Sequence, residues 1–369
     1  MTGLREAGHS GEVVVVGEEP LPPYDRTRLS KALLLGTAGP AGVALRTPDD
    51  YRSAGVELRL GERVVELELE ARRLRLEGGT VLAYDRLLLT TGAEARSLSA
   101  YPGALRLRRL PDGLELLEQL VAGRPLQVVG AGFVGCEVAV AARRRSCQVT
   151  VHELLAQPLQ RVLGRDLGAF LADVHRAHGV ELRTGSPAPA GLRAPVLAAV
   201  GSEPRVELAA GAGLAVDSGI LVDEYGATAV PGVFAAGDAA RFWSPLFEDR
   251  VRVEHFQTAW RHGYATGRAV AGDAHPFAEA PWFWSDQYDL NLQYVGAGLP
   301  WEEEVVRGTI GAAPFTVFYL RAGKLVAAAG VNDRRTVAQA RRLLETRAAV
   351  TRAQLEDPAL ELRRLAGHP

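Results

Sequence analysis

The chain has 369 residues, of which 47% are apolar and 23% are charged, and its formal net charge is −2. This length suffices for two or three domains, and the composition is that of a folded globular protein rather than a disordered or fibrous one. The near-neutral charge removes the electrostatic argument for a nucleic-acid partner. We find neither an apolar run of the ~18 residues that span a membrane nor a signal peptide, which predicts a cytoplasmic protein with no membrane partner.

The sequence contains two cysteines, Cys136 and Cys147. They lie eleven positions apart, which is not the CxxC spacing of a redox pair, and two cysteines cannot make a disulfide framework. Any redox chemistry is therefore expected to use a cofactor. Both side chains are expected to be small buried hydrophobes.

The first ninety residues are predicted to be mainly strands. Residues 13–16 are four valines, typical of a buried strand, and they end at Gly17-Glu18-Glu19. Residues 56–89 alternate apolar and polar side chains around a turn at Gly78-Gly79, which predicts antiparallel ribbon. At the end of that stretch, the apolar residues 87–89 predict a buried strand that enters a turn.

The strongest local signal is a glycine-rich turn between a strand and a helix. The apolar residues 126–129 lead to Gly130, Gly132 and Gly135 in GxGxxG spacing, and a helix is predicted over 137–145. In this context the first glycine permits a tight turn, the second lets a pyrophosphate approach the backbone, and the third lets the helix pack closely on the strand. The helix N-terminus offers unpaired N–H groups to phosphates. The pattern predicts dinucleotide binding rather than a glycine-rich turn without a ligand.

A second strand, over residues 148–152, ends at Glu153, which lies 23 positions after Gly130. An acidic side chain at this place accepts hydrogen bonds from a ribose 2′-hydroxyl and repels a 2′-phosphate. We therefore expect NAD to be preferred over NADP.

Two further strands and an aromatic segment follow. Residues 219–222 and 233–236 are apolar, and the second run leads directly to Gly237-Asp238. From Pro281 onward the composition shifts to aromatic side chains, which predicts a separate C-terminal domain.

Five segments carry motifs of a known type. They are residues 23–31, similar to PYxRPxLSK; 87–92, similar to a strand ending in ATG; 228–238, which fits T-x6-A-x-G-D; 252–256, similar to RVEHW; and 283–288, which matches FWSDQY. Together they resemble the flavin-dependent NAD(P)H:ferredoxin reductases of oxygenase systems, the putidaredoxin-reductase-like branch of the glutathione-reductase-like superfamily. The last two motifs are specific to this branch, and the similarity runs nearly the whole length of the chain.

The resemblance implies an α/β fold with two Rossmann-like dinucleotide-binding domains and a C-terminal α+β domain. The FAD domain would be discontinuous, with the NAD domain inserted into it. The implied segments are 1–106 for the first part of the FAD domain, 107–216 for the NAD domain, 217–279 for the second part of the FAD domain and 280–369 for the C-terminal interface domain.

The resemblance also implies a reaction. A hydride passes from NADH to FAD, and two single-electron steps then reduce an iron–sulfur ferredoxin. FAD and NAD would be the cofactors and the ferredoxin the partner, while the oligomeric state stays open. The absence of a dithiol in the sequence agrees with this reaction and separates the chain from the disulfide reductases.

Individual residues take roles from the same resemblance. Lys31, Glu137 and Trp284 are implied to be catalytic: the lysine near the flavin ring, the glutamate orienting the nicotinamide carboxamide and the tryptophan packing close to the flavin. No metal ligand is expected. The implied cofactor-binding residues are Glu18 or Glu19 at the adenosine ribose of FAD; Arg26, Lys31 and Arg108 at the FAD; Gly237 and Asp238 at the ribityl chain; Phe256 and Trp284 beside the flavin; and Gly130, Gly132, Gly135, Glu137 and Glu153 for NAD.

Simpler roles exist for several of these residues. Asp238 could cap a helix that follows Gly237, because aspartate is a favoured N-cap residue. Glu137 could be a solvated first-turn acid that the helix dipole favours. Phe256 and Trp284 could be ordinary core aromatics.

The sequence departs from the family at its start. The family opens with a strand and its own GxGxxG turn for FAD, whereas residues 1–6 resemble part of the helix that follows that turn. We therefore expect the FAD domain to be incomplete at its N-terminal side. This leaves an alternative to the reductase: a truncated, non-catalytic remnant that binds NAD but not FAD.

Overall fold

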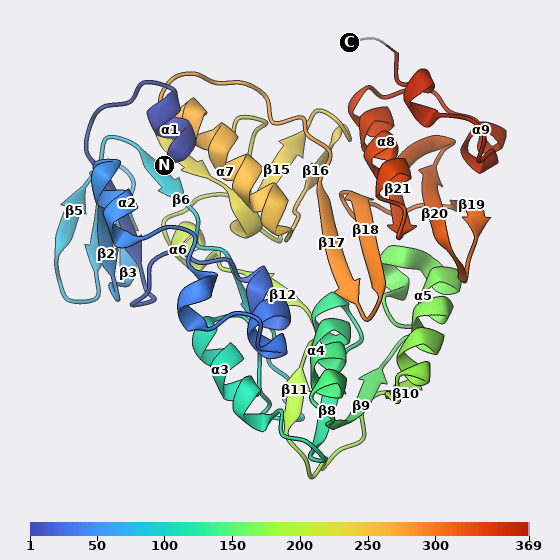
Figure 1. Ribbon diagram of the computed structural model, residues 1–369. Helices are drawn as coiled ribbons and strands as arrows, with labels where there is room; N and C mark the ends of the chain where they lie inside the picture. Colours follow the sequence, from blue (N-terminus) through green and yellow to red (C-terminus); the bar gives the residue numbers. More distant parts are fainter. Residues whose placement is uncertain (368–369) are drawn as a thin grey trace. The chain divides into compact units, whose positions relative to one another are not determined.

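The computed structural model describes residues 1–367 and divides into two compact units, whose elements are labelled in Figure 1. Unit 1 contains residues 1–25, 44–94 and 203–281, and unit 2 contains residues 26–43, 95–202 and the chain from Trp282 onward. Each unit is thus assembled from three separate stretches of sequence. Within the described range, no helix combines the length and the apolar character needed to cross a membrane.

Among the described residues, unit 1 contains three pairs of parallel strands, and two of these pairs are two-stranded sheets. β1 (Val13–Gly17) pairs with β2 (Val56–Leu60), and β6 (Leu87–Leu89) pairs with β14 (Val233–Ala235). In residues 1–367 the two pairs are separate sheets. The predicted antiparallel ribbon is wrong for β2, because alternation of side chains shows which face of a strand is buried and not the direction of its partner. A parallel partner requires a long crossover, which here includes helix α2 (Pro48–Ser53).

The rest of unit 1 contains an antiparallel three-stranded ribbon, a three-stranded sheet with one parallel and one antiparallel pair, and helices. The elements are α1 (Thr2–Glu6), β3 (Val64–Glu68), β4 (Arg73–Leu76), β5 (Val81–Ala83), α6 (Glu207–Gly211), β13 (Ile220–Val222), the 3-10 turn η3 (Gly237–Ala239), β15 (Ala240–Ser244), β16 (Asp249–Val251) and α7 (Phe256–Val270). β3, β4 and β5 form the predicted antiparallel ribbon, with its turn at Gly78-Gly79. Helix α1 packs along α7, as Figure 1 shows.

Unit 2 contains a four-stranded parallel sheet in the order β10-β9-β8-β11. β8 (Pro125–Val129) is paired on one side with β9 (Gln148–Glu153) and on the other with β11 (Val196–Ala198). β10 (Glu181–Thr184) lies at the edge, beside β9. Helix α4 (Phe133–Arg144) follows β8 and begins four residues earlier than predicted. The last glycine of the GxGxxG motif therefore lies in the first turn of the helix.

The C-terminal part of unit 2 is a five-stranded antiparallel sheet in the order β17-β18-β21-β20-β19. Its N-capped helix α8 packs on β21, and Asp333 caps this helix by accepting a hydrogen bond from the Thr336 N–H. The elements are β17 (Trp282–Gln287), β18 (Leu290–Gly296), β19 (Glu303–Thr309), β20 (Ala312–Arg321), β21 (Lys324–Val331), α8 (Arg334–Glu345), α9 (Arg352–Glu356) and η4 (Leu362–Leu365).

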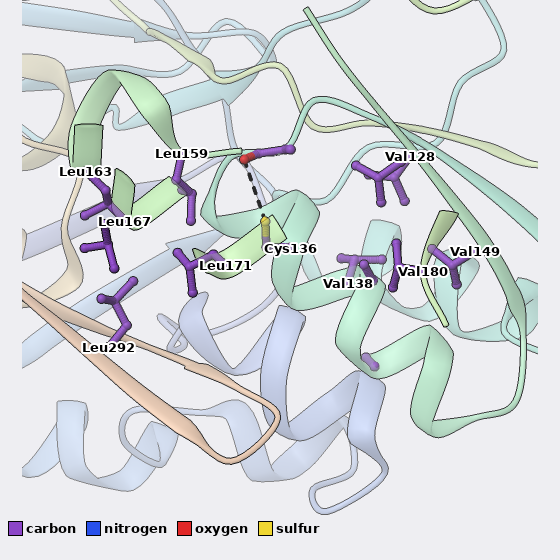
Figure 2. Packing of buried hydrophobic residues seen from close by; sticks show 14 of the residues in the cluster. Val128, Cys136, Val138, Val149, Leu159, Leu163, Leu167, Leu171, Val180 and Leu292 are labelled. Carbon is purple, nitrogen blue, oxygen red and sulfur yellow. Dashed lines mark hydrogen bonds between the residues drawn. The ribbon is translucent and has the colours of Figure 1, made fainter. Parts of the chain in front are cut away.

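One continuous hydrophobic core joins the two sheets of unit 2. Helix α5 (Gln160–Ala177) contributes Leu163, Leu167 and Leu171, all of them fully buried. Figure 2 shows these leucines between Leu292 of the C-terminal sheet and the buried side chains around α4. The domain boundaries drawn from the sequence stay a prediction.

The remaining elements of the chain are short. They are η1 (Leu29–Leu33), η2 (Pro40–Val43), β7 (Ala93–Ala95), α3 (Leu110–Gln119) and β12 (Ser202–Pro204). The π-helical turn η1 packs against α3 and α4, and its Leu29 and Leu33 are 1% exposed. A Cβ at Gly113 of α3 would lie 2.8 Å from Leu33 Cδ2, so this glycine permits the close packing. The packing fixes Ser30 and Lys31 beside α4.

Candidate functional site

The three glycines of the turn after β8 differ in their surroundings. Gly130 has φ +101°, and a Cβ there would lie 2.3 Å from the Ala199 carbonyl oxygen. A Cβ at Gly135 would lie 2.1 Å from the Gly130 carbonyl oxygen. At Gly132, by contrast, a Cβ would meet no atom within 4 Å. The first and third glycines are thus needed for packing, whereas the second leaves open space above the backbone at the start of α4.

Glu153 reaches this turn from the end of β9. One carboxylate oxygen accepts a hydrogen bond from the Ala131 N–H at 2.8 Å, and the other accepts one from the Leu155 N–H at 2.8 Å. The acid predicted at the strand end is therefore fixed by the glycine turn itself.

Glu137 is buried on α4, two positions after the last glycine, and is only 6% exposed. Its Oε2 accepts hydrogen bonds from Ser30 Oγ at 2.5 Å and from Lys31 Nζ at 2.8 Å. Its Oε1 accepts one from Ser285 Oγ at 2.7 Å. The alternative in which Glu137 is a solvated first-turn acid is therefore wrong, because its carboxylate is buried and accepts hydrogen bonds from three donors. The structure brings Lys31 and Glu137 together as an ion pair, and it adds two serines that the sequence analysis missed.

The two serines come from segments that the sequence analysis had singled out. Ser30 precedes Lys31 in the segment similar to PYxRPxLSK, and Ser285 lies in FWSDQY on β17. The only sequence signal for them was their place inside these motifs. Trp284, next to Ser285, is half-buried, and its ring centroid lies 5.9 Å from that of Trp282.

Two of the predicted FAD contacts lie elsewhere in unit 2 and touch each other. Arg26 donates a hydrogen bond from Nη1 to the Arg108 carbonyl oxygen at 2.7 Å. Asp112, in the first turn of α3, accepts from the N–H groups of Arg108 and Arg109. Arg26 and Arg108, the two predicted FAD contacts, are therefore both held at the start of α3.

Three of the predicted residues of unit 1 lie directly after β1 and at the start of α7. Glu18, after β1, forms an ion pair with Arg205 at 2.6 Å, and Glu19 accepts a hydrogen bond from Tyr24 at 2.6 Å. Phe256 is half-buried at the start of α7. These contacts occupy both glutamates with partners from the same unit.

Asp238 lies in the turn η3, directly after β14. The turn is followed by the strand β15, so the predicted alternative of a helix-capping aspartate is wrong. Gly237 has φ +74°, and its N–H donates to His262 Nδ1 at 3.4 Å. Burial lowers the pKa of His262 to about 4, so the ring is neutral and this nitrogen can accept.

Neither cysteine has the surroundings of a reactive thiol. Both are buried, and Cys136 Sγ lies 3.7 Å from the Ala131 carbonyl oxygen, the contact drawn in Figure 2. Burial raises the pKa of the Cys136 thiol far above its ordinary value, which disfavours the thiolate. Among residues 1–367, we find no group of three or more histidine, cysteine or acidic side chains placed to bind a metal.

Two family models match the chain. The model for pyridine nucleotide-disulphide oxidoreductases matches residues 1–189 and 194–263, and the model for the reductase C-terminal domain matches residues 282–366. The chain belongs to the pyridine nucleotide-disulphide oxidoreductase family. The predicted resemblance and the predicted α/β fold class are thereby confirmed.

Individual relatives narrow this result. The chain is 39% identical to the ferredoxin–NAD(+) reductase component of the anthranilate 1,2-dioxygenase system of Burkholderia cepacia and 34% identical to putidaredoxin reductase of Pseudomonas putida. These alignments cover 98% of this chain and 94% and 92% of the relatives. Among solved structures, it matches putidaredoxin reductase in its covalent complex with putidaredoxin, with a TM-score of 0.94, 34% identity, and coverage of 99% of this chain and 94% of that one.

Proposed function

We propose that the chain is a cytoplasmic reductase that takes electrons from NADH and passes them through FAD to an iron–sulfur ferredoxin of an oxygenase system. The observation that carries this proposal is the ion pair of the half-buried Lys31 with the buried Glu137 of α4, whose carboxylate also accepts hydrogen bonds from Ser30 and Ser285. The named relatives support the same activity, and none of them supports a non-catalytic remnant.

The glycine turn of unit 2 fits NAD. The open space at Gly132 leaves room for a pyrophosphate against the backbone, and the adjoining N-terminus of α4 supplies N–H donors and the positive end of the helix dipole. The hydrogen bond from the Ala131 N–H, which anchors Glu153 on the turn, supports our assignment of this acid as the acceptor for a ribose hydroxyl. We assign Gly130, Gly135 and Glu137 to the same site.

Unit 1 carries residues that fit FAD. Thr258 on α7 has a buried Oγ1 without a hydrogen-bond partner among residues 1–367, and α7 packs against the turn that holds Gly237 and Asp238. A buried hydroxyl without a partner is costly in a folded protein, so a polar ligand atom at this turn is favoured. When bound, FAD supplies the redox chemistry that accepts a hydride and gives up single electrons.

The remaining predicted residues keep their proposed roles at FAD. They are Glu18 or Glu19 at the adenosine ribose, Arg26 and Arg108 at the cofactor, and Phe256 and Trp284 beside the flavin.

The hydrogen-bond donors around Glu137 support a role for its carboxylate in orienting the nicotinamide. Three hydrogen bonds hold its carboxylate in one orientation, from which a free lone pair can accept from the nicotinamide carboxamide. Lys31 provides a positive charge that stabilises negative charge as it develops on a hydride acceptor. Glu137 in turn keeps the lysine in place. The pair therefore orients the donor and favours hydride transfer electrostatically.

Lys31 offers a direct test, because the sequence has only one other lysine, Lys324, which is exposed. We expect the protein, once loaded with FAD, to reduce ferricyanide and a ferredoxin with NADH. Lys31→Met should slow flavin reduction about 10-fold or more, whereas Lys324→Met should leave the rate unchanged. A parent protein that binds NADH but never reduces FAD would contradict the proposal.

A further inference from the structure

The hydrogen bonds around Glu137 continue into the interior of unit 2. Ser285 Oγ, which donates to Glu137, accepts from Gln287 Nε2 at 3.3 Å. Gln287 Oε1 in turn lies 3.0 Å from His175 Nε2 on α5. Ser285 and Gln287 are 0% exposed and His175 is 2% exposed. A continuous chain of buried polar groups therefore runs from α5 through β17 to the carboxylate.

This chain has one direction. Because a carboxylate only accepts, Ser285 must donate its hydroxyl hydrogen to Glu137, and its oxygen then accepts from the Gln287 amide N–H. The Gln287 oxygen consequently faces His175, whose Nε2 must carry the hydrogen. Every donor points toward Glu137, and hydrogen bonds aligned in this way strengthen one another.

The histidine end of the chain is in the matching form. His175 Nδ1 is buried and has no hydrogen-bond partner among residues 1–367, as expected for an unprotonated nitrogen. Burial lowers the pKa of His175, and the nearby His178 lowers it further, against the opposing effect of the Gln287 bond. The neutral ring with hydrogen on Nε2 satisfies all of these contacts.

A second histidine–glutamine pair shows that such a contact does not require a functional site. His152 Nε2 lies 2.8 Å from Gln127 Oε1 within the parallel sheet. The structure shows no hydrogen bond from this pair to Glu137 in the described residues. Both pairs have a histidine Nε2 beside a glutamine Oε1, but only the Gln287 amide donates to Ser285 and so connects to Glu137. A substitution at Gln127 is therefore the control for the same substitution at Gln287.

We propose that His175, Gln287 and Ser285 are positioning residues that hold the Glu137 carboxylate, and through it the Lys31 ammonium, in the geometry for hydride transfer. The inference rests on the proposed function, since it assigns the chain of hydrogen bonds to the same reaction. Loss of a link leaves Ser285 free to rotate, and a small displacement of a reacting group lowers the rate steeply.

The first measurement is independent of activity. In protein with ¹⁵N-labelled histidine, the ring signals of His175 are assigned through their loss in His175→Gln. We expect hydrogen on Nε2 in the parent protein, and a mixture of both neutral tautomers in Ser285→Ala, because Gln287 then loses the acceptor that fixes its orientation. A His175 ring with hydrogen on Nδ1 in the parent protein would overturn the proposal.

The second measurement separates positioning from folding. With FAD bound, Gln287→Met should slow flavin reduction by NADH about 10-fold, while the Kd for NADH changes less than about 2-fold. Gln127→Met should leave both unchanged even if it lowers Tm as much. His175→Leu should slow reduction about 3-fold, and His175→Gln should restore it, because a glutamine Nε2 can donate to Gln287 from a similar place.

The outcomes separate this inference from the proposed function. An active parent protein in which Gln287→Met reduces flavin at the parental rate would overturn the positioning role alone. An inactive parent protein with hydrogen on His175 Nε2 would overturn the proposed function and, with it, the assignment of the chain to that reaction. If Gln287→Met does not fold, Ser285→Ala, which removes one oxygen atom, decides the kinetic question.

Discussion

The parallel strands of the two units are paired differently. In unit 2, β8 has hydrogen-bonded neighbours on both sides, and its Val128 is 0% exposed. In unit 1, β1 pairs with β2 alone among the described residues, and its Val14 is 37% exposed. A parallel sheet is normally buried on both faces. The comparison shows that β8 has strand partners on both edges within its own sheet, whereas among residues 1–367 β1 and β6 each have a strand partner on one edge only.

Hydrogen exchange should show the largest difference between these strands. In a parallel pair every second N–H faces away from the partner, so half of the β1 amides have no donor–acceptor contact with β2. We expect peptides covering Val13–Gly17 to exchange about 100-fold faster than peptides covering Leu126–Val129. Equal protection would mean that another strand covers β1. The β9 peptides serve as an internal reference.

Alanine substitutions in the glycine turn of unit 2 test which glycines support the packing of that unit and which leave space for a ligand. Gly135→Ala should lower the free energy of unfolding by about 3 kcal/mol, because its Cβ would fall 2.1 Å from a backbone oxygen. Gly132→Ala should leave the stability unchanged and raise the Kd for NADH about 10-fold, because its Cβ enters the open space. Urea unfolding and NADH titration measure the two effects. Equal loss of stability in both variants would refute the distinction.

The choice of nucleotide should depend on Glu153. We expect the parent protein to bind NADH at least about 10-fold more tightly than NADPH, because the carboxylate repels a 2′-phosphate. Glu153→Gln should narrow the ratio to about 3-fold, while Glu181→Gln on the neighbouring β10 should not change it. Fluorescence titration of both nucleotides gives the ratio. Equal affinities in the parent protein would contradict this assignment.

The smallest effect is expected at the thiols. The double variant Cys136→Ser, Cys147→Ser should keep NADH-dependent ferricyanide reduction within about 3-fold of the parent protein, allowing for a small loss of packing. Both thiols are buried, and neither belongs to a redox pair. A folded double variant without activity would contradict a mechanism that relies on the flavin alone.

Local patterns in the sequence predicted much of the glycine turn after β8. The strand, the three glycines and Glu153 are close in sequence, and their spacing alone defines the motif. The resemblance to a family then predicted separate roles for Lys31 and Glu137, but not the contact between them. Their contact joins positions 106 apart, and the bond from Ser285 to Glu137 joins positions 148 apart, distances over which spacing carries no information.

The parallel pairing of β2 and the hydrogen bonds of His175 could not be predicted from the sequence, for related reasons. The side-chain pattern of a strand is the same for parallel and antiparallel partners. A histidine on an amphipathic helix gives no sign of which polar group it will meet. Both features depend on tertiary packing rather than on neighbours along the chain.

The shared core of unit 2 limits how this protein can be recombined with its relatives. Tyr319 of the C-terminal sheet donates a hydrogen bond to the Leu163 carbonyl oxygen of α5 at 2.9 Å, and the rings of Phe170 and Phe315 meet edge to face at 5.5 Å. A chimera that exchanges the chain from Trp282 onward would separate these packing partners. A chimera that exchanges α5 together with the chain from Trp282 onward keeps these contacts, and we expect it to be more stable.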